Sequence, residues 1–208
     1  MKKEAVSNLP IDPRYNLSGL SWSHLVMIEK DPEEWYDVYV LGHKRKPTEA
    51  MKFGTKVHKQ IAERKFRGKL KEVYYGNNPE TQLTCKIFYT KTKSFNIFGT
   101  PDDHGTLSLY EYKTGTKLWT QKQADNHGQL FTYALLLRES KKIYIDVAYL
   151  ISLETKHLTV NDKTKIVLTG NRRTLKVEIT PQDLLKIQAR FINGYKKVLK
   201  VIKEHEKR

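Results

Sequence analysis

The 208-residue sequence has a single cysteine, Cys85. One cysteine excludes an internal disulfide, and it also excludes any metal or iron–sulfur site that needs four cysteine ligands. Disulfides persist in oxidising compartments, and this chain does not depend on one. We therefore expect the protein to work inside a cell, in a reducing compartment.

Long hydrophobic runs are missing as well. The run at 133–137 is far too short to cross a bilayer, so no membrane partner is expected. The first ten residues have no apolar stretch behind their lysines, and we expect no secretory signal peptide. The chain has no GxxxxGK[ST] phosphate loop, which argues against an ATP-driven motor. No linker rich in Pro, Gly or Ser divides the chain, so one domain over 1–208 is expected.

Acidic residues are too few to balance the basic ones. The chain has 38 lysines and arginines against 23 aspartates and glutamates, for a formal net charge of +15 at pH 7. A protein this basic attracts polyanions, and nucleic acid is the commonest such partner. Most of the basic residues are lysines, however, and an AT-rich genome would also produce that bias. The charge therefore needs a site to support a function.

Helix and strand patterns both occur along the chain. They predict a helical N-terminal part (about 20–67), a core of strands with a helix (about 72–153), and C-terminal strands with a helix (about 157–205). Within these parts the expected helices are two short ones in 20–42, then 48–67, 120–138 and 181–202. The expected strands are 83–90, 95–99, 106–113, 143–153, 165–168 and 175–179.

The helix expected at 48–67 carries a histidine on its apolar stripe. Residues with the spacing of one buried helix face are Met51, Gly54, Val57, His58, Ile61 and Ala62. A lone histidine on such a face is usually a hydrogen-bonded core residue, but it can also be a metal ligand. Gly54 lies one turn before His58 and allows another group to approach closely.

The strand expected at 106–113 directs charge inward. Side chains alternate along a strand, so Leu107, Leu109, Glu111 and Lys113 are expected on one inner face. An unpartnered buried charge is costly. If Asp102 converges with Glu111, the two carboxylates supply the hard oxygens that Mg²⁺ or Mn²⁺ requires. The alternative is a simple ion pair between Glu111 and Lys113 on an exposed strand face.

The string Pro101-Asp102, eight residues, then Glu111-Tyr112-Lys113 resembles the signature of the PD-(D/E)XK nuclease superfamily. Further motifs match its RecB-like exonuclease branch in order and spacing. These motifs are Gly54 to His58, Gly99 to Asp102, Lys113-Thr114-Gly115, and Gln129 to Tyr133. The resemblance covers about 20–150. Several relatives carry four cysteines for an iron–sulfur cluster, which this chain cannot hold, so it resembles the stand-alone members of the branch.

The resemblance implies a fold and a set of site residues. The fold is an α/β, restriction-endonuclease-like core with a central mixed β-sheet flanked by α-helices. Mg²⁺ or Mn²⁺ is expected on Asp102, Glu111 and His58, together with the backbone carbonyl of Tyr112. Lys113 is the expected catalytic lysine.

Other residues are expected to contact the substrate. Gln129 and Tyr133, one helical turn apart, would help to position Lys113 or a phosphate. Trp119 would stack on a base or anchor the core, and Lys117 would hold a phosphate, as would Lys122 and the lysines of 56–71. Asp103 is expected to point away from Asp102 and to matter less.

These expectations make a metal-dependent DNA nuclease the first hypothesis, with an exonuclease of recombination, repair or replication favoured. The alternatives are an endonuclease of the same fold, or an inactive nucleic-acid-binding or adaptor protein. DNA is the expected partner, recombination or replication proteins are further candidates, and an oligomer is left open. The expected compartment is the cytoplasm, the cytoplasm of a phage-infected host, or an organelle matrix.

Overall fold

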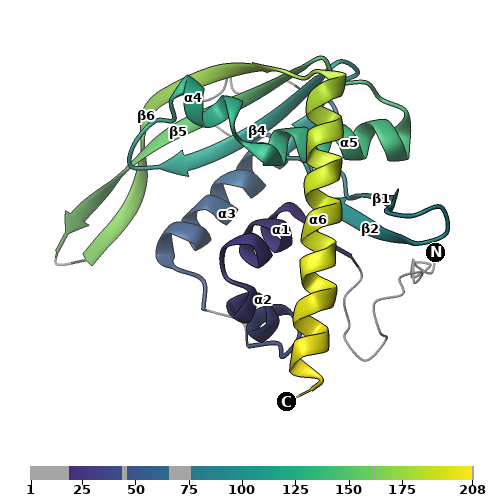
Figure 1. Cartoon of the computed structure of the whole chain (residues 1–208). Helices are drawn as coiled ribbons and strands as arrows, with labels where there is room; N and C mark the ends of the chain where they lie inside the picture. The colour runs from purple at the N-terminus through teal and green to yellow at the C-terminus, as the bar shows by residue number, and fades with distance from the viewer. Residues whose placement is uncertain (1–18, 44–45, 66–75, 162, 208) are drawn as a thin grey trace, which may run out of the picture.

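The computed structural model describes residues 19–43, 46–65, 76–161 and 163–207. The helices in this part of the chain are α1 (Trp22–Lys30), α2 (Pro32–Tyr39), α3 (Glu49–Ala62), α4 (Gln121–Asp125), α5 (Gly128–Lys141) and α6 (Pro181–His205) (Figure 1). The strands are β1 (Leu83–Phe88), β2 (Ser94–Gly99), β3 (Asp103–His104), β4 (Ser108–Gly115), β5 (Val147–Val160) and β6 (Lys163–Glu178).

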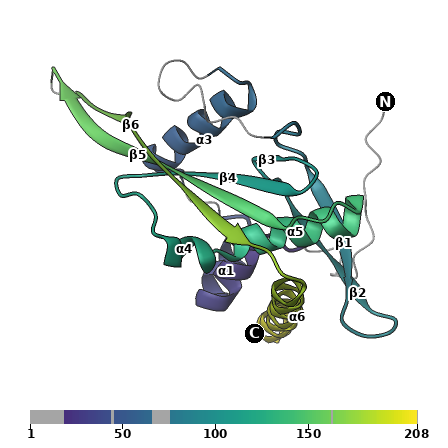
Figure 2. The same cartoon turned by 90° about the horizontal axis from the view of Figure 1, so that it is seen from above.

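A mixed sheet lies at the centre of the molecule, with strand order β3-β4-β5-β6. Strands β4 and β5 are parallel, while the other neighbours are antiparallel. Helix α5 lies in the crossover that parallel strands require. Figure 2 shows α3 on one face of this sheet and α5 on the other, with α6 packed beside α5. The expected central mixed sheet flanked by helices is therefore confirmed.

Strand β4 separates two hydrophobic clusters. The larger cluster lies on the α5 side and draws residues from most elements, from Leu20 to Ile202. The smaller cluster lies between α3 and the sheet and consists of Val57, Ile61, Tyr112, Ile151 and Leu153. Leu109 belongs to the larger cluster, so its strand neighbours at every second position, Glu111 and Lys113, also point toward α5.

The helix starts have side-chain caps of the usual types. Ser21 Oγ accepts a hydrogen bond from the His24 amide, and Asp31 Oδ1 accepts one from the Glu34 amide at 2.9 Å. Thr180 forms a capping box with Asp183, and Pro181 is the first residue of α6. One side of α6 is an apolar stripe that is buried throughout, at Leu184, Ile187, Phe191, Tyr195, Val198 and Ile202.

The helix predicted at 120–138 is wrong as a single element. The chain forms α4, breaks at Asn126 and His127, and restarts as α5 at Gly128. The Asn126 side chain donates to the Lys122 carbonyl and ends α4. Gly128 lets the Trp22 ring pack directly on the backbone, where any Cβ would overlap the ring. The break places His127 outside both helices.

The two strands predicted at 165–168 and 175–179 are one continuous strand, β6. Its partner β5 starts later than predicted and extends to Val160, so the two strands pair almost end to end. The polar residues between the two predicted strands do not interrupt them, because pairing with β5 satisfies their backbone. A β-bulge between Leu153 and Thr155 and a left-handed Gly170 shift the register instead.

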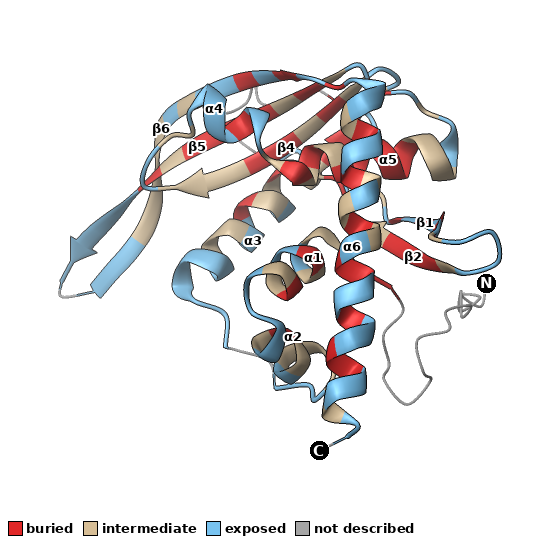
Figure 3. Ribbon diagram, in the orientation of Figure 1, coloured by how far each residue is buried: buried red, intermediate tan, exposed pale blue. Residues whose placement is uncertain are grey.

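Some predicted core positions are exposed. Leu107 is 61% exposed because β4 starts one residue later, so the strand alternation does not reach it. Met51 is also 61% exposed, although Val57 and Ile61 on the same predicted stripe are buried. Figure 3 shows both buried and exposed parts along α3. Helix α3 stops at Ala62 rather than near 67, with Arg64 at a positive φ of 53°. Residues 66–71, part of the predicted basic segment, lie outside the described residues. No helix in the described part of the chain is long and apolar enough to span a membrane.

Candidate active site

The candidate site forms at the edge of β4, where β3 ends. Strand β3 pairs only with Leu109 and Tyr110, so the following residues of β4 extend beyond it. There the Tyr112 amide donates to Asp102 Oδ2 at 2.8 Å. The N–H and C=O of a strand residue point to the same side, so the Tyr112 carbonyl also faces this edge.

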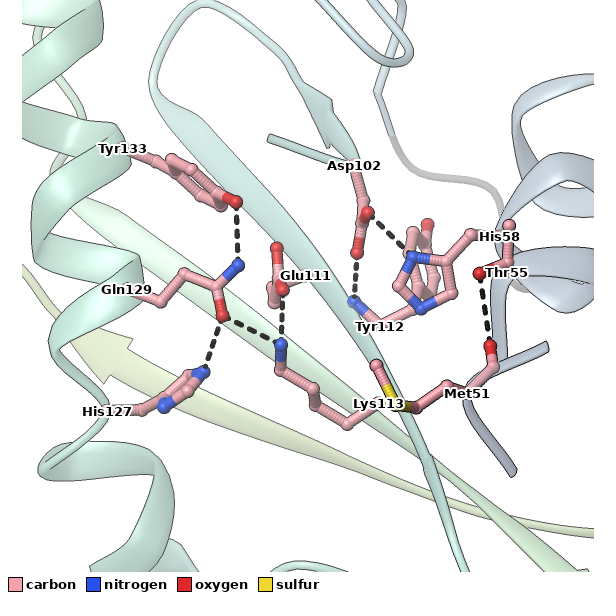
Figure 4. Close-up of polar contacts among 10 residues, drawn as sticks. All are labelled: Met51, Thr55, His58, Asp102, Glu111, Tyr112, Lys113, His127, Gln129 and Tyr133. Atoms are coloured by element: carbon pink, nitrogen blue, oxygen red, sulfur yellow. Dashed lines mark hydrogen bonds and ion pairs between the residues drawn. The ribbon is translucent and has the colours of Figure 1, made fainter. Parts of the chain in front are cut away.

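His58 reaches the same edge from α3. Its Nδ1 lies 3.0 Å from Asp102 Oδ1. Burial by itself lowers the pKa of His58, but the hydrogen bond to Asp102 and the charges of Asp102 and Glu111 outweigh burial and raise that pKa. Asp102 is therefore held between a helix and a strand that are far apart in the sequence (Figure 4).

Glu111 and Lys113 form a partly buried ion pair on the face of β4 that points toward α5. Lys113 Nζ donates to Glu111 Oε1 at 2.6 Å, and the Glu111 side chain is only 2% exposed. Burial is the main cause that raises the pKa of Glu111, the charge of Asp102 raises it further, and Lys113 opposes both. The alternative of an ion pair on an exposed strand face is wrong. Removing a carboxylate from water is costly unless a nearby opposite charge compensates it, and here Lys113 compensates Glu111.

One oxygen of this pair has no hydrogen-bond partner in the part of the chain that the structure describes. Glu111 Oε2 is buried and accepts no hydrogen bond from any residue that the structure describes. A buried carboxylate oxygen without a donor is costly, and such atoms mark strained or functional positions. It therefore provides a specific acceptor for a cation or a donor that is bound at this edge of β4.

Helix α5 supplies the remaining contacts of Lys113. Gln129 Oε1 accepts from Lys113 Nζ at 2.8 Å, and Gln129 Nε2 donates to the Tyr133 hydroxyl at 2.6 Å. His127 Nε2 lies 3.1 Å from the same Gln129 Oε1. Because that oxygen can only accept, His127 Nε2 carries the hydrogen. Figure 4 shows the resulting chain from His127 through Gln129 to Tyr133, with Lys113 bonded to its centre.

Burial keeps His127 and Tyr133, the two ends of this series of hydrogen bonds, neutral. Burial lowers the pKa of His127 to about 4, and the nearby Lys113 charge lowers it further. Burial also raises the pKa of Tyr133 above its ordinary value. Lys113 is therefore the cation of this group, and it is held by one carboxylate and one amide oxygen.

The donors at the edge of β4 match the preferences of a divalent cation. Two carboxylates, an imidazole and the Tyr112 carbonyl are the ligand types expected for Mg²⁺ or Mn²⁺. In the described residues Asp102 contacts His58 and Glu111 accepts from Lys113, and no three His, Cys, Asp or Glu side chains form a ready-made metal site. A bound cation would therefore replace part of the His58–Asp102 contact and would engage the unpartnered Glu111 Oε2.

The other predicted substrate contacts lie farther from the carboxylates. Trp119 is half-buried and packs against the larger core cluster. Its ring meets the His127 ring edge-on, with the two ring centroids 4.9 Å apart. Its amide donates to Ser152 Oγ, which favours a structural role for its backbone. Lys117 is exposed in the loop after β4.

Asp103 points away from Asp102, as expected. It is 4% exposed, and its carboxylate accepts from the amides of Gly76, Asn78 and His104. It therefore anchors the 76–78 loop and has a structural role that the sequence did not reveal.

His127 is the site residue that sequence reasoning missed. It lies within the predicted continuous helix at 120–138 and no role is predicted for it there, whereas the break before Gly128 turns it toward Gln129. The pair Asn126 and Gly128, a helix-terminating residue followed by a glycine, was the available signal for that break.

Comparisons with known proteins support this site's family. Residues 97–204, about half of the chain, match the family model described as the PD-(D/E)XK nuclease superfamily. A comparison with curated protein sequences found no match.

Solved structures of similar fold include an alkaline exonuclease, LHK-Exo, from Laribacter hongkongensis. It is 12% identical, with a TM-score of 0.52 over 94% of this chain and 96% of that one. The same exonuclease in complex with dAMP gives 12% identity and a TM-score of 0.53 over 94% of both chains. A putative exonuclease from Eubacterium rectale is 11% identical, with a TM-score of 0.56 over 97% of this chain and 86% of that one. These similarities establish the fold, and the expected restriction-endonuclease-like architecture is confirmed.

Proposed function

The chain belongs to the PD-(D/E)XK nuclease superfamily, and we propose that it is a DNA exonuclease that depends on Mg²⁺ or Mn²⁺. The single observation that carries this proposal is the Glu111–Lys113 ion pair, whose buried carboxylate has one oxygen without a hydrogen-bond partner among the described residues and lies close enough to Asp102 for the Asp102 charge to raise its pKa. A protein that had only kept the fold would not need to bury such a charged pair. Exonuclease activity is preferred because structurally similar proteins are described as exonucleases.

The proposed cation ligands are Asp102, Glu111, His58 and the Tyr112 carbonyl. When bound there, the cation lowers the pKa of a water molecule and neutralises charge on the scissile phosphate. Asp102 is already oriented for this role by its bonds to the Tyr112 amide and to His58. The pre-positioned carboxylates reduce the reorganisation that catalysis would otherwise require.

Lys113 is proposed as the catalytic lysine. An ammonium has three N–H donors, and two of those on Lys113 are directed to Glu111 and Gln129. The third is left to donate to a phosphate oxygen or to orient the attacking water. Gln129 and Tyr133 fix the direction of that donor, and Lys117 and Trp119 are proposed to contact the flanking nucleotides.

The larger core cluster combines residues of the N-terminal helices, the antiparallel strands β1 and β2, the central sheet and α6. We therefore also propose that residues 1–208 form one nuclease domain. Recombination or replication proteins and further copies of this chain remain candidate partners.

The test is cleavage of end-labelled single-stranded, duplex and circular DNA with Mg²⁺, Mn²⁺ or a chelator. We expect metal-dependent release of nucleotides from linear DNA and little attack on circles. The variants Glu111→Gln and Lys113→Ala should lose at least about 100-fold in rate, which is equivalent to about 2.7 kcal/mol of transition-state stabilisation. Lys196→Ala, on the exposed face of α6, is the control. Full activity in either site variant, or in chelator, would contradict the proposal, and cutting of circles would indicate an endonuclease.

A further inference from the structure

Strands β5 and β6 continue past the sheet as a two-stranded arm. The last residue of β4, Gly115, pairs opposite Glu154, and six further β5–β6 pairs follow, from Thr155–Leu168 to Val160–Lys163. We call residues 155–160 and 163–168 the arm. Figures 1 and 2 both show the arm projecting beyond the other elements, and Figure 3 shows its outer part exposed.

The base of the arm is fixed. The β-bulge next to Glu154 changes the strand direction there, and Glu154 Oε2 accepts from Thr169 Oγ1 at 2.8 Å and from Asn171 Nδ2 at 2.7 Å. A bulge increases local twist and redirects the strand that follows. The arm is therefore held at a defined angle to the sheet.

A groove of about 510 Å³ lies between the arm and α3. Its lining residues are Glu49, Lys52, Phe53, Lys56, His157, Thr164, Lys165 and Ile166. Phe53 and Ile166 provide apolar surface, and lysines come from both walls. An aromatic group between basic rims is the arrangement by which proteins bind single-stranded nucleic acid.

The charge of this groove selects its occupant. Its one acid, Glu49, is paired with Lys52 at 2.6 Å. Lys56 and Lys165 have no ion-pair partner among the described residues. A second copy of this chain, with a net charge of +15, would be repelled by the groove, whereas phosphates would be attracted.

Helix α3 contributes residues both to the groove and to the candidate active site. Lys52, Phe53 and Lys56 line the groove, and His58 contacts Asp102. Lys52 and Lys56 precede His58 by six and two residues, which is about 9 Å and about 3 Å along the helix axis. A strand that is bound in the groove would thus lie beside the helix that carries His58.

We propose that this groove binds a single-stranded segment of the DNA substrate, with phosphates on Lys56 and Lys165 and a base on Phe53. The inference rests on the proposed nuclease function and adds the path of the substrate. Duplex DNA presents phosphates but keeps its bases stacked inside, so its bases would not contact Phe53 and Ile166. The arm is therefore a binding element specific for unpaired strand.

The experiment measures binding without cleavage. Fluorescence anisotropy of a labelled oligo(dT) is recorded in EDTA over a range of KCl concentrations for the full chain. In the double variant Lys56→Gln, Lys165→Gln we expect weaker binding and a salt slope smaller by about 1.4, because each lost single-strand phosphate contact removes about 0.7. Phe53→Leu, which keeps apolar bulk, should weaken binding without changing the slope. The matched control is Lys196→Gln, Lys197→Gln on α6, which should leave the slope unchanged.

The outcomes distinguish failure of the groove proposal from failure of the proposed nuclease function. Wild-type cleavage of DNA combined with an unchanged slope in the Lys56, Lys165 variant would overturn the groove and keep the nuclease. Absence of any DNA binding by the wild type would overturn both. Equal losses for oligo(dT) and a duplex of the same length would overturn the single-strand specificity. Light scattering gives the oligomeric state of each protein. If the wild type is a dimer and the Lys56→Gln, Lys165→Gln variant is a monomer, the arm is an interface between copies and the proposal is overturned.

Discussion

The backbone amide of Tyr112 donates to Asp102 Oδ2 at the point where β4 extends beyond β3. A β-strand edge normally offers its amides to a neighbouring strand, and here a carboxylate takes that position. The same carboxylate contacts His58 through its other oxygen. This one side chain therefore connects the sheet edge to α3 and places the candidate ligands together.

Asp102 and Asp103 are adjacent but should fail in different ways. Asp102→Asn should abolish cleavage with little change in stability, because Asp102 is proposed to bind the cation. Asp103→Ala should lower the free energy of unfolding by about 3 kcal/mol, because three backbone amides lose their buried acceptor. Urea denaturation and DNA cleavage, measured on both variants, check this. Equal stability losses would contradict the division of roles.

His127 should act through Gln129. Gln129 Oε1 accepts from His127 Nε2 and from Lys113 Nζ. His127→Ala removes the first of these donors, so the side chain of Gln129 and the direction of Lys113 become less defined. We expect kcat to fall roughly 10-fold, equivalent to about 1.4 kcal/mol, while KM changes little. His127→Gln, which keeps a donor, should recover part of the loss. A change in KM alone would assign His127 to substrate binding instead.

His24 should make folding sensitive to acid. It lies between Tyr39 and Phe98, and its Nδ1 is 3.2 Å from the Gly19 carbonyl. Burial lowers its pKa from 6.5 to about 4. The unfolded chain therefore binds a proton more readily than the folded one between these values, and stability falls as pH falls through this window.

The size of this acid effect is about 2 to 3 kcal/mol. Replacement by a residue that does not titrate, His24→Gln, should remove this share of the pH dependence. Denaturant midpoints measured from neutral pH down to about pH 4 check the prediction. A slope with pH that is the same in both proteins would show that His24 does not carry it.

Gly128 should tolerate no side chain. A Cβ at this position would overlap the Trp22 ring, and Arg190 is stacked over the same ring at 4.7 Å from its centroid. Gly128→Ala should therefore cost about 2 kcal/mol of stability despite the better helix propensity of alanine. Gly115→Ala, whose Cβ would make only an ordinary contact of 3.5 Å with the Lys117 carbonyl oxygen, is the control. Thermal melts of both variants decide, and a stabilised Gly128→Ala would contradict the packing argument.

Local chemistry determined much of this protein. The caps Ser21, Asp31 and Thr180 and the buried stripe of α6 follow from side-chain type and spacing, since a helix start and an amphipathic face depend on residues only a few positions apart. The placing of Glu111 and Lys113 on one face of β4 follows in the same way, from strand alternation. The family signature depends on such short spacings as well.

Tertiary structure decided the rest. Leu107 is exposed because β4 begins after it, and the single helix predicted at 120–138 is broken because Trp22, about 100 residues earlier, packs on Gly128. The arm exists because β5 and β6 pair beyond the end of β4. Each of these features depends on partners that are distant in the sequence, and only the helix break has a local signal, in Asn126 and Gly128.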